Sequence, residues 1–304
     1  MTPTRRSFLL TTAALTASHQ LAGQAPVESG ISLAAWSFSG SFFQGRWKLL
    51  DLPGILREKL GIQALEHVNQ FFENPTLSYL QKLKKACGDN GVRSTILMVD
   101  SEGSTASPDA AERRQAAIAH RKWIDVAQYL GCRSVRINMY GGAQDWKQDR
   151  DLVKRAAETI HLLLDYSRGS NLNILVENHG QASSDPEVLT ALVKEVNHPN
   201  FGLLCDLGNW NKGEDRYAAV KKILPLARGL SVKGTWGANL DPAFDAEKLV
   251  KTALEGSYAG WWGLEVTPRR GSGAPATPEE QFTREVQTIL EAKAIVERVV
   301  LKKG

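Results

Sequence analysis

The stretch LNILVENHG, at residues 172–180, combines the pattern of a buried strand with a polar end. Its apolar core leads directly into a carboxylate, an amide and an imidazole at Glu177, Asn178 and His179. A short apolar run of this kind, bounded by turn residues, is typical of a strand that is buried on both faces. Polar side chains at its tip are costly to bury, so the stretch predicts a buried strand that delivers functional groups at its end.

Strand-like runs recur along the whole chain. They begin near residues 31, 61, 92, 132, 172, 201, 229 and 261, and helical patterns alternate with them over residues 51–60, 76–90, 108–130, 151–169, 185–196, 214–228, 245–258 and 277–300. Eight alternations of strand and helix, spaced by about 30 to 40 residues, are the arrangement of a (β/α)₈ barrel. The sequence therefore predicts an α/β fold, a single-domain TIM barrel.

Residues that start and end helices agree with this parse. Caps stand at Asp51, Ser107-Pro108, Asp185-Pro186 and Thr277-Pro278, and helix-ending glycines stand at Gly61, Gly91 and Gly131. A doubly wound open sheet is the alternative. It would place a glycine-rich phosphate turn after the first strand, and residues 37–45, SFSGSFFQG, match that motif poorly.

Residues 1–25 precede the barrel pattern, which occupies residues 26–304. Arg5 and Arg6, the apolar stretch that follows them and a small-residue end at Ala25 resemble a twin-arginine (Tat) export signal. The alternative is an amphipathic N-terminal helix. The apolar stretch is too short to span a bilayer, so we expect a mature protein that is not membrane-embedded. The resemblance implies a bacterial protein that the Tat machinery exports, already folded, to the periplasm or the medium.

The composition excludes several classes of protein. The chain has 304 residues, of which 42% are hydrophobic and 23% charged, as is ordinary for a globular protein. Its formal net charge of +4 falls to +2 without Arg5 and Arg6, which argues against a nucleic-acid partner. Cys87, Cys132 and Cys205 form no metal-binding motif, so we expect three small buried hydrophobes, with an optional disulfide left open.

In a TIM barrel the active site lies at the carboxyl ends of the strands. A two-residue period turns a set of polar side chains inward there: Glu66, Arg136, Asn138, Glu177, His179, Asp206, Ser231, Lys233, Glu265 and Thr267. Acids that are buried together are unfavourable unless they are protonated or bind a cation. A divalent metal ion held by Glu177, Asp206 and Glu265 resolves this conflict, and oxygen ligands favour Mn²⁺, with Mg²⁺ or Co²⁺ as alternatives. A ring of salt bridges to nearby bases is the competing interpretation.

The last four strand ends carry a family resemblance. LVENHG (175–180), LLCDLGNW (203–210), SVKGTW (231–236) and WWGLEVTP (261–268) resemble the sugar phosphate isomerase/epimerase superfamily, the xylose isomerase-like TIM barrels. The resemblance implies metal ligands at Glu177, Asp206 and Glu265. The family's fourth ligand, a histidine, is replaced here by Ser231, a weak neutral oxygen ligand. His179 is either a substitute ligand or a substrate contact.

The predicted metal site suits proton transfer next to a carbonyl. The ion would stabilise the enediolate of an open-chain sugar as a Lewis acid, with Glu177 and Glu265 as base and acid on the two faces of the substrate. Substrate contacts are predicted for Glu66, Arg136, Asn138, Asn209 and Lys233. For Arg136 and Asn138, pairing with Glu66 or Asp206 is the alternative. Aromatic residues near strand ends stack on sugar rings or pack in the core: Trp36, Phe38, Phe71, Phe72, Trp210 and Trp236.

Together these residues predict a metal-dependent sugar isomerase or epimerase with a carbohydrate substrate. A lyase that acts on 3-keto glycosides would use the same enediolate. A sugar-binding barrel without catalysis is the third alternative, because Ser231 lacks the imidazole. An endonuclease of the same superfamily would need a histidine-rich zinc cluster and a basic face, and six histidines with a small net charge supply neither. A homo-oligomer is left open.

Overall fold

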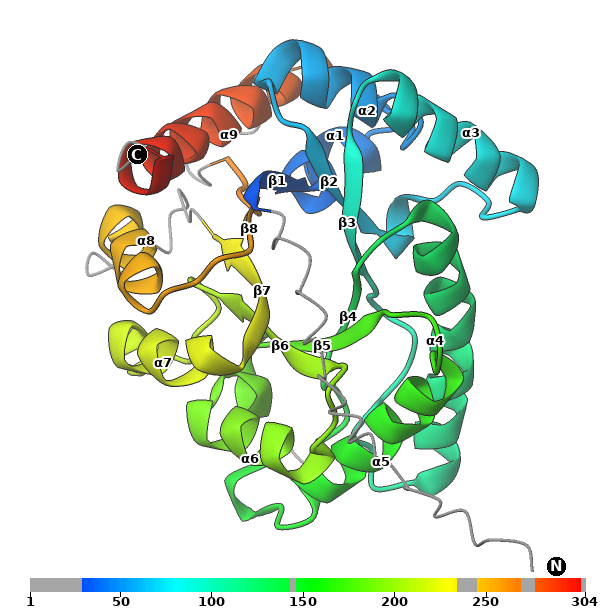
Figure 1. The fold of residues 1–304 in the computed structure, drawn as a ribbon, viewed down its shortest axis with the longest axis vertical. Coiled ribbons are helices and arrows are strands. Elements are labelled where there is room, and N and C mark those ends of the chain that lie inside the picture. The colour runs from blue at the N-terminus through cyan, green and yellow to red at the C-terminus, as the bar shows by residue number, and fades with distance from the viewer. Residues whose placement is uncertain (1–28, 143–145, 234–244, 269–276, 302–304) are drawn as a thin grey trace, which may run out of the picture.

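The computed structural model describes residues 29–142, 146–233, 245–268 and 277–301. Eight parallel strands form a closed barrel in sequence order, and the last strand pairs with the first (Figure 1). The strands are β1 (Gly30–Ala34), β2 (Ala64–Val68), β3 (Arg93–Met98), β4 (Ser134–Ile137), β5 (Asn173–Glu177), β6 (Phe201–Asp206), β7 (Ala227–Val232) and β8 (Trp261–Leu264). The predicted TIM barrel is confirmed.

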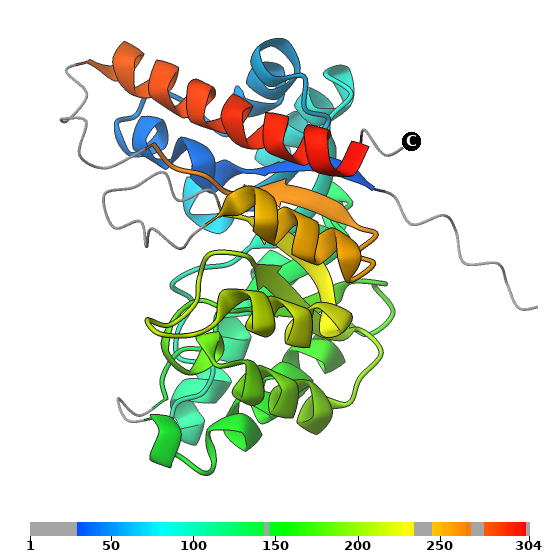
Figure 2. The same cartoon turned by 90° about the vertical axis from the view of Figure 1, so that its left-hand side faces the viewer.

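Helices form an outer ring around the strands, as two views of the ribbon show (Figures 1 and 2). They are α1 (Ser39–Phe43), α2 (Leu52–Ile55), α3 (Leu77–Asp89), α4 (Ala110–Leu130), α5 (Leu152–Tyr166), α6 (Pro186–Val196), α7 (Arg216–Ile223), α8 (Ala246–Glu255) and α9 (Pro278–Val300). Short helical turns join them: η1 (Ala35–Phe38), η2 (Leu56–Leu60), η3 (Asn69–Phe71), η4 (Trp146–Gln148), η5 (Gln181–Ser184) and η6 (Leu224–Leu226). Each predicted helical stretch contains a helix.

Most predicted helix boundaries are confirmed. Asp185 caps α6, and Thr277 caps α9, each by accepting hydrogen bonds from backbone amides of the first turn. Gly61 and Gly131 end their helices with left-handed backbone, at φ values of 62° and 85°. The predicted helix over 214–228 is too long, because Pro225 lies in the turn η6 and cannot continue the α7 ladder. Strand β7 therefore begins at residue 227.

The cap predicted at Ser107 is wrong. Asp109 caps α4 instead, because its carboxylate accepts a hydrogen bond from the amide of Ala111. The Ser107 hydroxyl donates to Glu112 and accepts from the amide of Asp109, so it orients the capping residue rather than the helix.

An apolar layer crosses the interior of the barrel. Strands β2, β4 and β6 bury all their residues, as expected of strands that are covered on both faces. Inside, Ile96, Leu175 and Leu204 approach the backbone of Gly229, where a Cβ would lie 3.2–3.5 Å from their methyl groups. This layer separates the carboxyl ends of the strands from their amino ends.

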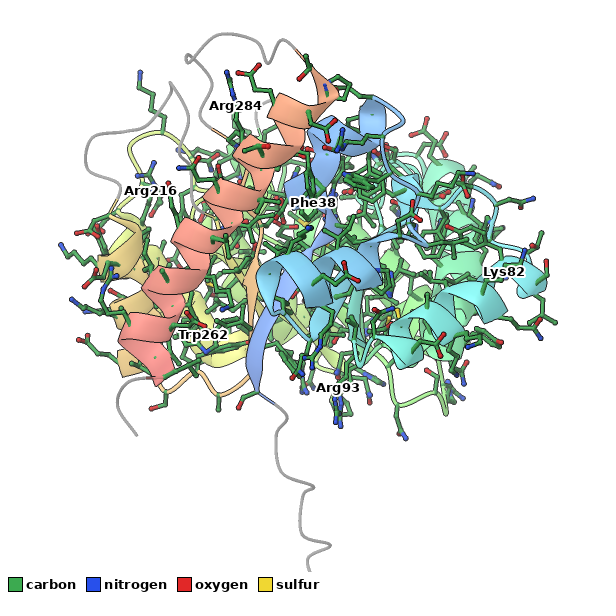
Figure 3. All side chains as sticks on the ribbon, turned by 90° about the horizontal axis from the view of Figure 1, so that it is seen from above. Phe38, Lys82, Arg93, Arg216, Trp262 and Arg284 are labelled. Atoms are coloured by element: carbon green, nitrogen blue, oxygen red, sulfur yellow. The ribbon has the colours of Figure 1, made fainter. Side chains whose placement is uncertain are left out.

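Helix α9 covers the first segment of the barrel. Glu285 accepts hydrogen bonds from the hydroxyl of Ser41, at 2.5 Å, and from its amide, at 3.0 Å. The ring of Phe38 stacks on Phe282 of α9 with centroids 5.8 Å apart. Figure 3 shows Phe38 among the side chains of the packed interior, whereas Lys82 points away from it. These contacts fix the carboxyl end of β1 against the last helix.

Cys87, Cys132 and Cys205 are buried free thiols, as predicted. The predicted export signal at residues 1–25 lies outside the described residues. Within the described ranges, no helix is both long and apolar enough to cross a membrane.

Candidate functional site

Three acids meet at the carboxyl ends of the strands. Glu177 is the last residue of β5, Asp206 is the last residue of β6, and Glu265 directly follows β8. All three are buried, and one carboxylate oxygen from each lies within 4.8 Å of the other two. Because the strands are parallel, their carboxyl ends all lie at one end of the barrel. Acids that are far apart in the sequence therefore lie close together there. We call Glu177, Asp206 and Glu265 the acidic triad.

Two cations contact the acidic triad. The Nε atom of Arg136, on β4, lies 2.9 Å from Oε2 of Glu177, although the two atoms are not aligned as a hydrogen bond. The Nζ atom of Lys233 donates to Oε1 of Glu265 at 2.7 Å and lies 3.3 Å from Oδ2 of Asp206. The salt bridges that the sequence offers as the alternative to a metal ion are therefore formed in part.

The two cations do not balance the acids around them. Asp100 is also in contact with Arg136, through an ion pair of 2.6 Å. Among the described residues, ionised Asp100 and the acidic triad carry four negative charges, and Arg136 and Lys233 carry two positive ones, which leaves a deficit of two positive charges. One divalent cation would neutralise this deficit, and uncompensated buried charge is strongly unfavourable.

The pKa values of the acidic triad reflect the same shortage of positive charge. Burial raises the pKa of Asp206 to about 7, although Lys233 opposes the shift. Burial also raises the pKa of Glu177 despite the neighbouring Arg136. At Glu265 burial acts in the same direction, but the charge and hydrogen bond of Lys233 lower the pKa. A bound cation would favour the ionised form of all three acids.

Several buried oxygens of the site lack a hydrogen-bond partner among the described residues. They are Oε2 of Glu177, Oδ2 of Asp206, Oε2 of Glu265 and Oγ of Ser231. Ser231 is fully buried and lies in register with Asp206 on the neighbouring strand. Buried polar atoms normally form hydrogen bonds, so converging oxygens that lack them fit a hard divalent cation such as Mn²⁺ or Mg²⁺. The donor set thus agrees with a metal site.

Asp100 is a central residue of the site that the sequence reasoning missed. It follows β3, and one of its oxygens accepts from Arg136 and from Nδ2 of Asn138, both at 2.6 Å, while Nε1 of Trp36 donates to the other at 3.0 Å. Burial alone would raise the pKa of Asp100, but Arg136 lowers it. Arg136 and Asn138 thus pair with Asp100, not with Glu66 or Asp206. The signal was available, because Asp100 ends the apolar run VRSTILMVD.

Two asparagines shape the acidic triad. Asn178 donates to the carbonyl of Asp206 at 2.9 Å and accepts from its amide at 2.7 Å, so it fixes the end of β6 against β5. Asn209 donates through Nδ2 to Oε1 of Glu177 at 3.1 Å. The structure therefore places Asn209 beside Glu177 and adds Asn178 as a supporting residue; the substrate contact of Asn209 stays a prediction.

His179 lies at the edge of the site. Its Nδ1 is 3.4 Å from the hydroxyl of Tyr140, and its ring is not among the described groups that meet within 4.8 Å. Burial, Arg136 and Lys233 lower its pKa, so the ring is held neutral. A neutral imidazole at the rim can exchange hydrogen bonds with a substrate, and its role as ligand or contact stays a prediction.

Glu66 lies inside the barrel, 1% exposed. Its Oε1 accepts a hydrogen bond of 2.6 Å from Ser32, and its carboxyl group fills the space beside Gly263, where a Cβ would lie 2.4 Å from that oxygen. Burial raises the pKa of Glu66 to about 8. It is therefore a neutral acid at pH 7, and its predicted contact with substrate stays a prediction.

The aromatic residues named from the sequence mainly pack in the core. Phe38, Phe71, Phe72 and Trp210 are buried, whereas Trp36 is partly exposed and makes ring contacts with Phe71 at 5.2 Å and with Phe43 at 6.0 Å. Trp236 lies outside the described residues. Of this set, Trp36 contacts the site directly, through Asp100.

Solved structures with the same fold include sugar epimerases. The chain superposes on an L-ribulose 3-epimerase with a TM-score of 0.71 at 16% identity, covering 91% of this chain and 97% of that one. A 3-keto-D-glucoside 4-epimerase from E. coli gives 0.63 at 12% identity, covering 87% and 99%. An IolI protein with a bound zinc atom gives 0.69 at 15% identity, covering 88% and 98%. At such identities the likeness shows the fold alone.

No curated protein matches the sequence significantly. The profile of one protein family does match, and it spans most of the barrel. Residues 56–292 fit the family described as xylose isomerase-like TIM barrel, and the chain belongs to that family.

Proposed function

We propose that this protein is a sugar isomerase or epimerase that depends on a divalent metal ion. The observation that carries the proposal is the buried acidic triad, with its deficit of two positive charges among the described residues and its oxygens that lack hydrogen-bond partners. The fold is shared with an L-ribulose 3-epimerase and with a zinc-binding protein, which supports the same reading. The family assignment is consistent with it.

Glu177, Asp206 and Glu265 would hold the ion, which we propose to be Mn²⁺, with Mg²⁺ or Co²⁺ as alternatives. When bound, a divalent ion supplies Lewis acidity that stabilises negative charge on neighbouring carbonyl and hydroxyl oxygens. Ser231 replaces the expected histidine ligand, so we expect weaker metal binding than a site with an imidazole would give. The neutral oxygen of Ser231 leaves the charge of the site unchanged.

The residues of the chain can move a proton between two faces of a sugar. Glu177 and Glu265 come from β5 and β8, which are not neighbours in the barrel. Arg136 favours the ionised form of Glu177, and Lys233 favours that of Glu265, so each carboxylate can accept a proton. Lys233 has further N–H groups, and its side chain is about 20% exposed, so it can donate to a substrate oxygen. Epimerisation next to a ketone requires that one carboxylate remove a proton from one face and that the other, in its protonated form, return a proton to the opposite face; aldose–ketose isomerisation requires removal of a proton from one carbon and return of a proton to the next.

A lyase that acts on 3-keto glycosides is a second candidate. The structural likeness to a 3-keto-D-glucoside 4-epimerase favours it, because that protein acts on an oxidised glycoside. Proton removal next to the ketone, followed by loss of the group on the next carbon, would use the same carboxylates.

We further propose that residues 1–25 direct export by the Tat machinery. Fractionation of cells that express wild type or an Arg5→Lys/Arg6→Lys variant tests this, because the variant should stay inside.

The metal proposal is tested by titrating Mn²⁺ into chelator-treated protein by calorimetry. We expect one ion per chain, and a loss of affinity of at least about a hundredfold in Glu177→Gln and in Glu265→Gln, because each loses a ligand. Glu285→Gln is the matched control, since Glu285 is a buried acid that contacts Ser41 instead of the triad. A wild type that takes up no divalent ion would overturn the proposal.

The reaction is tested with the metal-loaded protein in D₂O. A panel of ketoses should acquire deuterium at the carbon next to the carbonyl if the protein is an isomerase or epimerase. Release of an aglycone from 3-keto glycosides identifies the lyase. Metal binding with neither result, across a broad panel, would favour a sugar-binding barrel without catalysis.

A further inference from the structure

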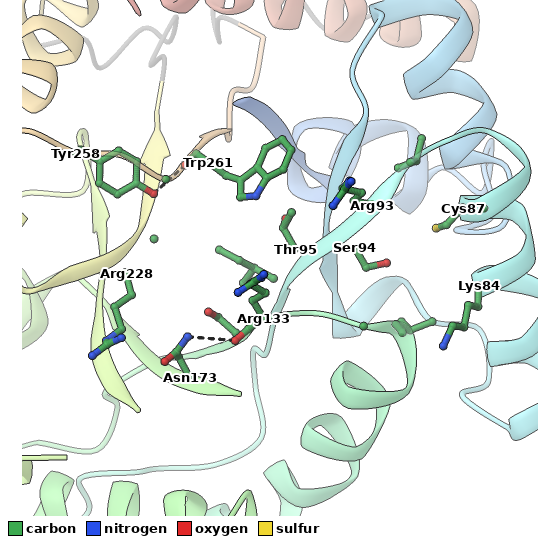
Figure 4. Close-up of a pocket in the computed structure, with 18 residues that line it drawn as sticks. Lys84, Cys87, Arg93, Ser94, Thr95, Arg133, Asn173, Arg228, Tyr258 and Trp261 are labelled. Atoms are coloured by element: carbon green, nitrogen blue, oxygen red, sulfur yellow. Dashed lines mark hydrogen bonds between the residues drawn. The ribbon is translucent and has the colours of Figure 1, made fainter. Parts of the chain in front are cut away.

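A cavity lies at the end of the barrel opposite the acidic triad, where the strands begin. Its volume is about 520 Å³, and its walls come from the first residues of β3, β4, β5, β7 and β8 together with the ends of α3 and α4 (Figure 4). Ile96 and Gly229 lie at its inner end, so the apolar layer closes it towards the acidic triad. The cavity and the acidic triad are therefore separate sites at the two ends of the barrel. We call this space the basal cavity.

Every charged residue that lines the basal cavity is a cation. The set is Lys84, Arg93, Arg133 and Arg228, and no aspartate or glutamate occurs among the lining residues that the structure describes. Figure 4 shows Arg228 on one side of the cavity, Arg93 and Lys84 on the other, and Arg133 between them. Cations gathered around one concave space attract anions, and the low-dielectric walls strengthen the attraction.

The hydrogen bonds of Lys84 and Arg228 leave the charge of these two side chains uncompensated. Lys84 donates to the carbonyl of Tyr129 at 2.7 Å, and Arg228 donates to the carbonyls of Phe201, at 3.0 Å, and Pro199, at 2.5 Å. Carbonyl groups orient the cations without neutralising them. For the guanidinium of Arg133, the described residues offer no hydrogen-bond or ion-pair partner.

Neutral groups around the basal cavity suit an organic ligand. The hydroxyls of Ser94, Thr95 and Ser134 and the amide of Asn173 line it, and Trp261 and Tyr258 present aromatic faces at one side. Pockets that bind small molecules span about 300 to 1,000 Å³, so the basal cavity is larger than inorganic phosphate needs. Arginine forks match phosphate geometry with two parallel hydrogen bonds.

We propose that the basal cavity binds a small phosphate-bearing molecule, independently of the acidic triad. Calorimetry on chelator-treated full-length protein should detect binding of inorganic phosphate and of glucose 6-phosphate, and no binding of glucose. Each of Arg133→Gln and Arg228→Gln should weaken phosphate binding about tenfold, as expected for the loss of one charged hydrogen-bond donor. Glu177→Gln should bind phosphate like wild type.

Arg114→Gln is the matched control, because it removes the same charge from an exposed position on α4 outside the basal cavity. Circular dichroism and thermal unfolding verify that each variant is folded. Three results would each overturn the proposal: no phosphate binding at millimolar concentration, an equal loss of affinity in Arg114→Gln, or binding of malonate as tight as that of phosphate. Loss of phosphate binding in Glu177→Gln would place the ligand at the acidic triad instead.

Discussion

Glu66→Gln tests the electrostatics of the barrel interior without removing a member of the acidic triad. Burial raises the pKa of Glu66 to about 8, and the group is 1% exposed. Between its ordinary pKa, 4.5, and about 8, the folded state binds a proton that the unfolded state has released. Folding stability therefore falls as the pH rises through this window, because the folded state binds more protons.

The magnitude follows from the size of the shift. pH 7 lies about 2.5 units above the pKa of this carboxyl in the unfolded chain. Keeping the group protonated in the folded state therefore costs on the order of 3 kcal/mol of folding stability. Glutamine has almost the same shape and can accept the hydrogen bond of Ser32, but its amide lacks a second partner, which costs about 1 kcal/mol. We expect Glu66→Gln to stabilise the metal-free protein by about 2 kcal/mol at pH 7 and to destabilise it slightly at pH 4.

Urea unfolding of both proteins at several pH values between 4 and 8 measures this difference. Glu195→Gln is the control for the loss of a carboxylate, since Glu195 is exposed on α6. A Glu66→Gln effect that does not change with pH would refute the reasoning. If Glu66→Gln also lowers Mn²⁺ affinity more than tenfold, Glu66 acts on the metal site and is more than a buried acid of the interior.

Three further perturbations probe the site and its support. Mn²⁺ should raise the thermal midpoint of wild type at pH 8, and the gain should shrink below pH 7, because protons compete at Asp206, whose pKa is raised to about 7; an equal gain at pH 5.5, by scanning fluorimetry, would contradict this. Asp100→Asn should lower the free energy of unfolding by about 3 kcal/mol, because it breaks the buried pair with Arg136; a loss below about 1 kcal/mol would show that the pair is not a stability element. Ser41→Ala should cost about 1 to 2 kcal/mol in urea unfolding, since Glu285 loses its hydroxyl donor, and an unchanged midpoint would argue against that contact.

The sequence was sufficient for the fold and for the acidic triad because both follow from periodicity. Eight alternating patterns determine the barrel, and parallel pairing brings strand-end acids to one side. Glu177, Asp206 and Glu265 could therefore be placed together before any coordinates. Asp100 obeys the same rule, but it follows β3, whereas the family resemblance is strongest in the last four strands.

Other features depend on contacts that no local pattern encodes. Asn178 fixes the backbone of Asp206 across two strands, and an asparagine after a strand has many other uses. The sequence predicted Ser107 as the cap of α4, whereas Asp109 caps it in the structure, because two residues that can cap a helix lie within one turn of each other. The cations of the basal cavity stand at the starts of separate strands and meet only when the barrel closes.

The apolar layer has a consequence for the long-range field of the molecule. Carboxylates gather on one side of it, at the acidic triad, and cations gather on the other, in the basal cavity. These two groups of opposite charge contribute to an electric dipole along the barrel axis, although the formal net charge of the chain is small. Such a dipole guides metal ions to one mouth and anions to the other during diffusion, and salt weakens this guidance because the Debye length is about 10 Å at 0.1 M ionic strength.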